Sequence, residues 1–302
     1  MSDALTIIEV GPRDGLQNEA TPIPTAAKAQ FVRDLAAAGL REIEVSSFVS
    51  PKWVPQLGDA AELAELLRDL EGEVAMSYLV PNRTGLDRAL EAGVSRIALF
   101  TAASDAFTQK NVNATVAETL ERFAEVIAAF RAAVPHGFVR GYVSTIVECP
   151  YAGRVAPSAV ADVVAQLRDL GVDEISLGET LGVAIPPEIE AVADSVGRSF
   201  PIEKTAWHFH DTRGTAIANV AAMLARGYRR FDSSAAGLGG CPYAKGAGGN
   251  LATDDLAYLA ERMGLTTGID RAQLARASQP VLEALNRTPF AKAQLASLAD
   301  GT

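Results

Sequence analysis

The chain has 302 residues, of which 48% are hydrophobic and 21% charged, and its formal net charge is −10 at pH 7. This acidic excess argues against general binding to nucleic acid or to an anionic membrane surface, because both would repel the protein. No apolar run reaches the roughly 18–20 residues of a membrane span, and two cysteines are too few for a disulfide framework. We therefore predict a cytoplasmic globular protein with neither a nucleic-acid nor a membrane partner.

Strand-like and helix-like segments alternate along the whole chain. The first strand is predicted at residues 5–10 and leads into the polar loop 11–19, after which Thr25 begins a helix that Gly39 ends. The same unit repeats with strands at 42–47, 74–79, 96–100, 138–146, 174–177, 205–210 and 229–234. Helices are predicted at 25–38, 59–70, 83–92, 115–133, 157–170, 187–196 and 216–225. A glycine-rich loop and two further helices follow the last strand.

Eight strand–helix units in a chain of this length favour a closed barrel, because alternating strands and helices pair in parallel through right-handed crossovers. We predict a (β/α)8 TIM barrel with additional C-terminal helices, as one domain over residues 1–302 with a mobile tail from about 288. The alternative is a doubly wound open sheet. Such a sheet usually carries Gly-x-Gly-x-x-Gly after its first strand, whereas residues 11–15 here read GPRDG.

Enzymes with a TIM barrel build their active sites on the loops that follow the strands. Polar residues of unusual type occur at those places in this chain. They are Arg13, Asp14, Glu44, Ser104, Lys110, Glu148, Cys149, Glu179, His208, His210, Cys241 and Asn250. Because so many separate loops would converge on one rim of the barrel, we expect the functional site there.

His208 and His210 form a His-x-His sequence at the end of a predicted strand. Alternate strand residues project to the same face, about 7 Å apart, so both imidazoles could bind one divalent metal ion. Asp14 is the best further ligand and Asn250 could add an amide oxygen, a mixture of donors that suits Mg²⁺ or Mn²⁺. Asp211 could orient one histidine. The alternative is a pair of core histidines with local hydrogen bonds, beside a turn aspartate.

Three further residues have side chains suited to catalysis. Arg13, next to Asp14, could stabilise an enolate or bind a carboxylate, unless it only forms a surface salt bridge. Glu44 lies between apolar residues of a buried strand, where a carboxylate must be paired or hydrogen-bonded. Cys241 lies in the glycine-rich loop 237–250, which could move over a substrate, and is a plausible acid or base.

Several of these segments closely resemble the 3-hydroxy-3-methylglutaryl-CoA (HMG-CoA) lyase family. They are residues 10–19 (VGPRDGLQNE), 43–56 (IEVSSFVSPKWVPQ), 102–113, 177–182, 208–211 and 237–254, which together run through nearly the whole chain. The resemblance implies a TIM-barrel metalloenzyme that cleaves HMG-CoA to acetyl-CoA and acetoacetate, in leucine degradation and ketone-body metabolism, and that forms a homodimer. By position, the family's metal ligands correspond to Asp14, His208, His210 and Asn250, and its catalytic residues to Arg13, Glu44 and Cys241.

The chain departs from the family pattern at Glu179. The family typically reads Gly-Asp-Thr where this chain reads Gly-Glu-Thr at 178–180. The extra methylene moves the carboxylate by about 1 Å, which is enough to affect catalytic geometry. We expect Glu179 to act at the site, His208 to take the substrate's hydroxyl proton, and the CoA part of the substrate to contact side chains on the rim. The predicted CoA contacts are Lys52, Ser104 and Lys110.

Three other functions stay open at this point. The first is a lyase for another 3-hydroxy-3-alkyl-acyl-CoA, such as citramalyl-CoA or a longer-branched analogue of HMG-CoA. The second is an aldolase or condensing enzyme of the wider metal-dependent barrel superfamily, against which the Cys241 loop argues. The third is a barrel that binds a CoA ester without turning it over.

Overall fold

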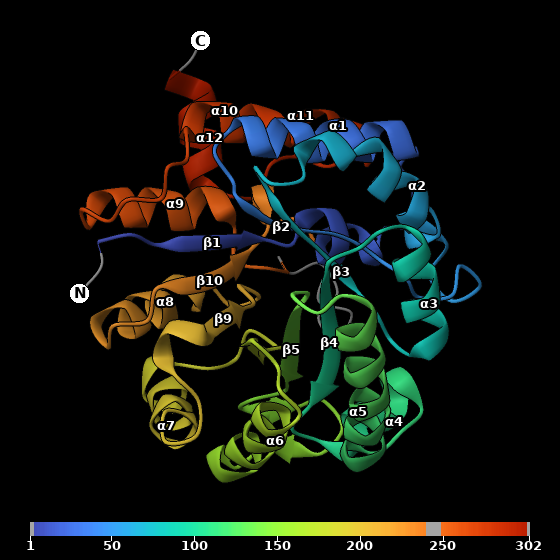
Figure 1. The fold of residues 1–302 in the computed structure, drawn as a ribbon. Coiled ribbons are helices and arrows are strands. Elements are labelled where there is room, and N and C mark those ends of the chain that lie inside the picture. The colour runs from blue at the N-terminus through green and yellow to red at the C-terminus, as the bar shows by residue number, and fades with distance from the viewer. Residues whose placement is uncertain (1–2, 240–248, 301–302) are drawn as a thin grey trace.

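The computed structural model describes residues 3–239 and 249–300. Its central element is a closed barrel of parallel strands in the order β1-β10-β9-β8-β5-β4-β3-β2, which confirms the predicted TIM barrel and excludes the open sheet (Figure 1). The barrel strands are β1 (Thr6–Glu9), β2 (Glu42–Ser47), β3 (Ala75–Leu79), β4 (Arg96–Ala102), β5 (Phe138–Ser144), β8 (Glu174–Glu179), β9 (Thr205–Phe209) and β10 (Arg230–Ser233).

Helices surround the barrel on its outer side (Figure 1). The helices that connect successive strands are α1 (Thr25–Ala37), α2 (Ala60–Leu66), α3 (Arg83–Glu91), α5 (Val116–Ala133), α6 (Pro157–Asp169), α7 (Pro186–Val196) and α8 (Ala216–Ala225). Each places an apolar stripe on the strands, so strand and helix side chains form one continuous core. No helix among the described residues is both long and apolar enough to cross a membrane.

Two connections are more structured than the sequence predicts. Residues 105–112 form a helix, α4 (Asp105–Val112), where we expected a loop; its polar sequence has too weak an apolar periodicity to be recognised. A short antiparallel hairpin of β6 (Glu148–Cys149) and β7 (Gly153–Arg154) follows β5. The helix predicted at 59–70 is instead α2 followed by a 3₁₀ turn, η3 (Arg68–Leu70).

Four helices, not two, follow the barrel in the part of the chain that the structure describes. They are α9 (Thr253–Arg262), α10 (Arg271–Ala277), α11 (Gln279–Ala284) and α12 (Lys292–Asp300). Helix α12 lies within the segment predicted to be a mobile tail. The Gln294 side chain is buried there and donates from Nε2 to the Ala275 carbonyl (3.0 Å) and the Ser278 hydroxyl (2.7 Å). These bonds attach the end of the chain to α10.

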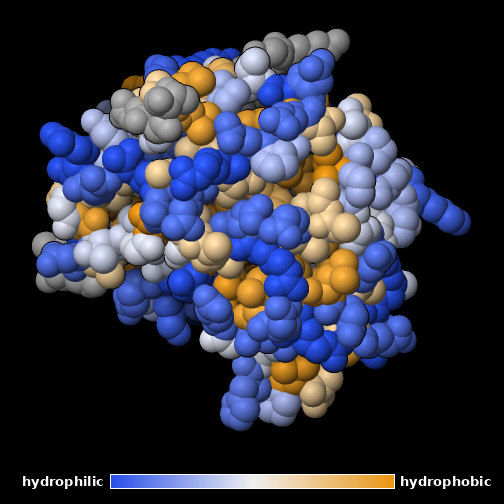
Figure 2. All heavy atoms as spheres, turned by 90° about the horizontal axis from the view of Figure 1, so that it is seen from above, coloured by the Kyte–Doolittle hydropathy of each residue, from blue (hydrophilic) through white to orange (hydrophobic). Residues whose placement is uncertain are grey.

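The surface agrees with the acidic composition. Figure 2 shows the face over α1 and the C-terminal helices, on which hydrophilic side chains predominate and apolar ones lie between them in smaller areas. Several large apolar side chains are nevertheless exposed, among them Trp53 and Phe290. Scattered exposed apolar residues are normal on a folded domain and identify no partner by themselves.

Gly39 should be far less replaceable than Gly72, although both adopt a positive φ (+104° and +90°). A Cβ added at Gly39 would lie 2.1 Å from the Gly268 carbonyl oxygen, whereas one added at Gly72 meets nothing within 4 Å. We expect Gly72→Ala to lower the free energy of unfolding by about 1 kcal/mol, because of its positive φ alone. Gly39→Ala should lower it clearly more, because the backbone at Gly268 must also shift. Urea unfolding of both variants measures the difference. Equal losses of unfolding free energy in the two variants would show that the backbone at Gly268 shifts without cost.

Candidate functional site

Three of the predicted metal ligands come together at the carboxyl end of the barrel. His208 is in β9, His210 directly follows it, and Asp14 lies in a π-helical turn, η1 (Gly11–Gly15), after β1. The two histidine Nε2 atoms are 3.3 Å apart, and Asp14 Oδ2 lies 4.0 Å from His208 Nε2. One ligand atom from each residue fits within 4.8 Å of the others, so a single ion could contact all three.

The chemistry of this cluster fits a divalent cation. Burial alone would raise the pKa of Asp14, but the charge of Arg13, the two histidines and the Asn250 hydrogen bond together hold it well below its usual range, so its carboxylate is ionised. Burial and the neighbouring His208 lower the pKa of His210 to about 4, so its imidazole is neutral. His210 Nδ1 is also buried and has no hydrogen-bond partner among residues 3–239 and 249–300. An ionised carboxylate and a neutral imidazole are the forms that bind a metal.

Asn250 joins this cluster from the far side of the glycine-rich loop. It pairs with His210 in an isolated β-bridge, and its Nδ2 donates to Asp14 Oδ2 (2.9 Å) and to the Leu238 carbonyl (3.1 Å). Its Oδ1 is buried and has no partner among the described residues, while its amide nitrogen is the atom that contacts Asp14, so Asn250 as a metal ligand stays a prediction. The structure therefore brings all four predicted ligands together.

Arg13 and Glu44 form a buried ion pair beside the cluster. Arg13 donates from Nη1 to Asp14 Oδ1 (2.6 Å) and from Nη2 to Glu44 Oε2 (2.9 Å), and Glu44 Oε2 also accepts the Tyr142 hydroxyl (2.6 Å). This pair is not a surface salt bridge, because Arg13 is 5% exposed and Glu44 is fully buried. Arg13 Nε and Glu44 Oε1 are buried and have no hydrogen-bond partner in the part of the chain that the structure describes. Each residue thus keeps one polar atom free for a bound molecule.

Asp232, which the sequence analysis missed, orients His208. Its Oδ2 lies 3.2 Å from His208 Nδ1 and accepts the Ser176 hydroxyl at 2.7 Å, and its Oδ1 accepts a bond from the buried Arg140. Burial lowers the pKa of His208, but the Asp232 contact outweighs it and raises the pKa overall. A carboxylate on Nδ1 leaves Nε2 facing the cluster, as in many metal-bound histidines. Asp211, the predicted orienting residue, instead accepts the Ala216 amide at the start of α8 (2.9 Å).

The same signal that identified Glu44 could have found Asp232, Arg140 and Tyr142. Both charged residues lie within buried strands, where a charge must be paired, and Tyr142 is two residues after Arg140 on the same face of β5. Arg140 is 2% exposed and Asp232 1%. Sequence alone could not show that they face the histidines, because β5 and β10 are separated by two strands in the barrel.

Glu179 lies elsewhere than expected. In the pairing of β8 with β9, Gly178 is level with His208 and Glu179 with Phe209, so Glu179 points to the core side of the sheet. Its Oε1 accepts the Val183 amide at 3.2 Å. Burial raises the pKa of Glu179, and the amides of residues 181–184 partly offset that effect. No described contact joins it to the metal cluster; its Oε1 holds the following loop, and its Oε2 is buried without a partner among the described residues.

The remaining predicted site residues are less closely placed. Ser104 is buried before α4, and its hydroxyl donates to Cys149 Sγ at 3.1 Å, so it packs against the hairpin. Lys110 is exposed in the last turn of α4, and Lys52 is exposed in the loop after β2. Cys241 lies outside the described residues.

Glu9, which the sequence did not identify either, forms hydrogen bonds to three segments of the rim. Its Oε1 accepts the amides of Gly11 (2.8 Å) and Ala235 (2.9 Å), and its Oε2 accepts the Thr253 hydroxyl (2.6 Å). Gly11 begins the turn that carries Arg13, and Thr253 begins α9 just after Asn250. Burial raises the pKa of Glu9 to about 7, although these hydrogen bonds oppose the rise.

A closed parallel barrel with imidazole and carboxylate donors at the carboxyl ends of its strands defines a class, the TIM-barrel enzymes with a metal-binding rim. The chain matches the model of the family described as HMGL-like over residues 4–281, and it belongs to that family.

Several relatives are similar to this chain over nearly their full length. A Pseudomonas aeruginosa protein named 3-hydroxy-3-isohexenylglutaryl-CoA/hydroxy-methylglutaryl-CoA lyase is 47% identical, over 97% of both chains. The crystal structure of hydroxymethylglutaryl-CoA lyase from Pseudomonas aeruginosa superposes with a TM-score of 0.95 at 46% identity, over 99% of both chains. An HMG-CoA lyase of Acinetobacter baumannii in complex with coenzyme A and 3-methylmalate gives a TM-score of 0.90 at 34% identity, over 98% of this chain and 96% of that one.

Replacing Glu9 with glutamine should stabilise the protein increasingly as the pH rises. The folded pKa of about 7 lies above the ordinary 4.5, so the stability that Glu9 contributes is complete below 4.5 and is lost as the pH rises through 7. Glutamine can accept the same two amides and does not ionise. The advantage of Glu9→Gln in free energy of unfolding should therefore grow between about pH 5 and about pH 8, by on the order of 3 kcal/mol.

Urea unfolding at several pH values measures this difference. Asp254, whose pKa burial raises to about 6, titrates in both proteins and cancels in the comparison. Glu121→Gln, at an exposed position of α5, is the matched control. A difference between parent and Glu9→Gln that stays constant with pH would mean that Glu9 ionises normally when buried.

Proposed function

We propose that this protein cleaves HMG-CoA into acetyl-CoA and acetoacetate in a reaction that depends on a divalent metal ion. The observation that carries the proposal is the Asp14–His208–His210 cluster directly beside the buried Arg13–Glu44 pair, in a chain of the HMGL-like family. The names of the relatives support the substrate, and the Acinetobacter baumannii complex supports a CoA ester.

Asp14, His208, His210 and Asn250 would hold the ion. When bound, Mg²⁺ or Mn²⁺ supplies Lewis acidity that lowers the pKa of the C3 hydroxyl. The fit rests on this structure, because one donor atom from each of Asp14, His208 and His210 converges and the buried Asn250 Oδ1 has no partner among the described residues. Both nitrogens of His208 are then engaged, Nδ1 by Asp232 and Nε2 toward the cluster. We therefore assign His208 to metal binding alone. The proton transfer that the sequence led us to expect of His208 is assigned instead to Glu44.

Glu44 is suited to receive the proton of the C3 hydroxyl. Its Oε2 is held by Arg13 and Tyr142, whereas its Oε1 is buried and no described residue bonds to it. As the O–H proton leaves, the C3–O bond becomes the ketone of acetoacetate and the C2–C3 bond breaks. Its electron pair forms the enolate of acetyl-CoA, and a proton delivered to C2 completes the second product.

Arg13 is suited to stabilise that enolate. Its Nε is a buried donor without a partner, and the two ion pairs with Asp14 and Glu44 fix the guanidinium. A preorganised cation in a water-poor site stabilises developing negative charge more strongly than water does. Cys241, whose position lies outside the described residues, is proposed as the donor of the proton to C2.

The second candidate substrate is an HMG-CoA analogue with a longer substituent at C3. It is favoured by the Pseudomonas aeruginosa relative, whose name includes the 3-isohexenyl analogue. The homodimer, the cytoplasmic location and the placing in leucine degradation and ketone-body metabolism stay predictions.

Metal-dependent product release tests the proposed reaction. Purified protein stripped with a chelator should release no acetoacetate from HMG-CoA, and added Mg²⁺ or Mn²⁺ should restore equal amounts of acetoacetate and acetyl-CoA. The isohexenyl analogue should be assayed in parallel, because turnover of that ester alone would replace the proposed substrate. Activity that is indifferent to the chelator would contradict the role of the cluster.

Replacing Arg13 with methionine should reduce kcat by roughly 100- to 1000-fold, the usual effect of removing one preorganised donor. Bound metal should be unchanged by mass spectrometry, since none of the four proposed ligands is altered. Arg13→Met leaves the Glu44 carboxylate buried without its cation, which by itself destabilises the fold. The double variant Arg13→Met/Glu44→Gln removes that charge, so it shows whether any loss of folding comes from the unpaired carboxylate. Arg33→Met, at an exposed arginine of α1 paired with Asp69, is the surface control. Loss of metal by a folded Arg13→Met protein would make Arg13 a structural residue.

A further inference from the structure

Two apolar side chains near the carboxyl ends of neighbouring strands are not covered by the core. Leu79 ends β3 and Phe100 lies two residues before the end of β4, and both are partly exposed although most of each strand is buried. Neither belongs to the continuous core that strands and helices form. The direction in which each side chain points decides what could cover it.

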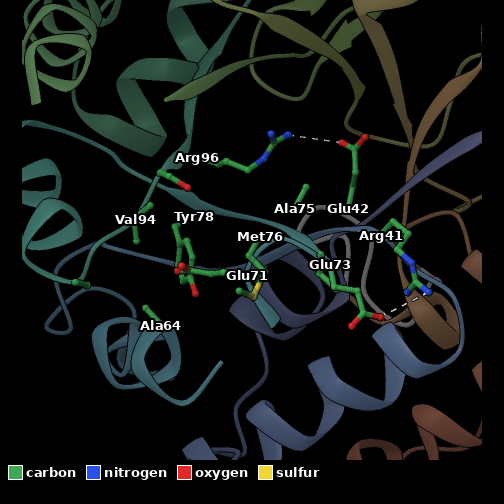
Figure 3. A pocket seen from close by; sticks show the side chains of 14 residues that line it. Arg41, Glu42, Ala64, Glu71, Glu73, Ala75, Met76, Tyr78, Val94 and Arg96 are labelled. Carbon is green, nitrogen blue, oxygen red and sulfur yellow. Dashed lines mark ion pairs between the residues drawn. The ribbon is translucent and has the colours of Figure 1, made fainter. Parts of the chain in front are cut away.

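Leu79 points into the barrel. Side chains alternate between the two faces of a strand. Figure 3 shows this alternation in β3, where Ala75 lies on the same side of the sheet as Arg96, whereas Tyr78 lies on the side of helix α2. Leu79 follows Tyr78, so its side chain returns to the inner face. It stands there at the carboxyl end of the strand, the end at which such barrels build their sites.

Phe100 also points into the barrel, next to a residue of the proposed site. The Thr101 hydroxyl bonds to that of Thr119 in α5 (2.7 Å) and therefore faces the helices, which leaves the inner face to Phe100. Phe100 is in register with Tyr142 of β5, whose hydroxyl donates to Glu44 (2.6 Å). The Phe100 ring thus adjoins the residue that holds the proposed base.

Helix α4 and the hairpin after β5 hold the Phe100 ring in place. Its centroid lies 6.3 Å from that of Phe107 in α4, with 46° between the two planes, and Phe107 is 3% exposed. Phe107 in turn lies 6.3 Å from the ring of Tyr151, between β6 and β7. Aromatic pairs at this spacing attract one another in tilted arrangements. Phe100 therefore presents a fixed ring to the mouth of the barrel.

Leu79 and Phe100, here called the Leu79–Phe100 wall, lie across the barrel from the metal cluster. In the closed strand order, β3 is four strands away from β9, and β4 is four strands away from β10. His208 is in β9, and Asp232, which orients it, is in β10. The wall is thus an apolar surface that faces the polar donors and acceptors of the proposed site.

We propose that the Leu79–Phe100 wall receives the C3 substituent of the substrate and determines how long that substituent can be. This inference rests on the proposed function, because a C3 hydroxyl directed to the metal and Glu44 turns another C3 substituent toward the opposite wall. A carboxylate on this wall would lose hydrogen bonds to water, whereas a hydrocarbon group would cover the exposed parts of both side chains. The wall therefore selects 3-hydroxyacyl-CoA esters that carry an apolar group at C3.

Two variants change the space at this wall in opposite directions. Phe100→Ala leaves room that a methyl group cannot fill, so the ratio of kcat/KM for the isohexenyl ester to kcat/KM for HMG-CoA should rise at least about tenfold. Leu79→Phe narrows the same space, and the ratio should fall at least about tenfold. These factors are reasonable because a single methylene in an apolar pocket changes kcat/KM by about 10- to 200-fold.

Leu66→Phe, at an exposed position of α2, is the matched control for Leu79→Phe and should leave both kcat/KM values unchanged. Urea unfolding checks that each variant is folded. If Phe100→Ala does not fold, Phe100→Leu should shift the ratio in the same direction by a smaller factor. A fall of kcat/KM by the same factor for both esters, or a ratio that is unchanged or shifts the other way, would overturn the proposal.

Failure of the wall and failure of the proposed reaction give different results. Cleavage of either ester with a ratio that both variants leave unchanged would contradict the wall and keep the reaction. If the parent protein cleaves neither ester, the reaction is contradicted, and the ratio of the two Kd values tests the wall instead. Calorimetric titration of the Mg²⁺-loaded protein gives these Kd values, and the variants should shift their ratio in the directions given above. Binding of neither ester would contradict both.

Discussion

The contact between Arg140 and Asp232 in the middle of the barrel is the constraint on which the site depends. An isolated charge in this interior would cost several kcal/mol, so each of the two requires the other. Because Arg140 occupies Oδ1 of Asp232, only Oδ2 is left for Ser176 and for the Nδ1 atom of His208. That contact determines which nitrogen of His208 faces Asp14 and His210. The geometry of the metal cluster is therefore set below the rim, by residues that touch no substrate.

The same network continues to the other end of the barrel. Arg140 pairs with Glu174 (2.9 Å), Glu174 with Arg230, and Arg230 with Glu42 at the amino-terminal end of the barrel. Charges alternate along this series, so nearly every member is compensated on two sides. Arg96 stands at its end, where the nearest carboxylate oxygen that the structure describes belongs to Glu42 at 3.9 Å. The barrel interior thus balances its buried charges in a continuous series that begins below the histidines.

The fold could be predicted from sequence because it rests on local signals. Alternating strands and helices, closed by glycines such as Gly39, were sufficient for the barrel and for the rim that carries Asp14, Glu44 and the histidines. What could not be predicted depends on pairing between distant strands. Asp232 and Arg140 are 92 residues apart, and only the order of strands in the closed barrel brings them together. Helix α4 escaped prediction for the opposite reason, since its local pattern is weak.

Glu179 shows how a strand that is two residues longer than predicted changes the position of a side chain. With a strand ending at 177, as predicted, Glu179 would belong to a loop and could turn toward the metal. Strand β8 instead runs to Glu179, and strict alternation gives the inward position to Gly178, beside His208. The Glu179 carboxylate then accepts the Val183 amide, while Arg213 donates to the carbonyl of Leu181 in the same loop (3.1 Å). Because Arg213 lies three residues after His210, the loop that Glu179 holds supports the histidine end of the cluster from outside.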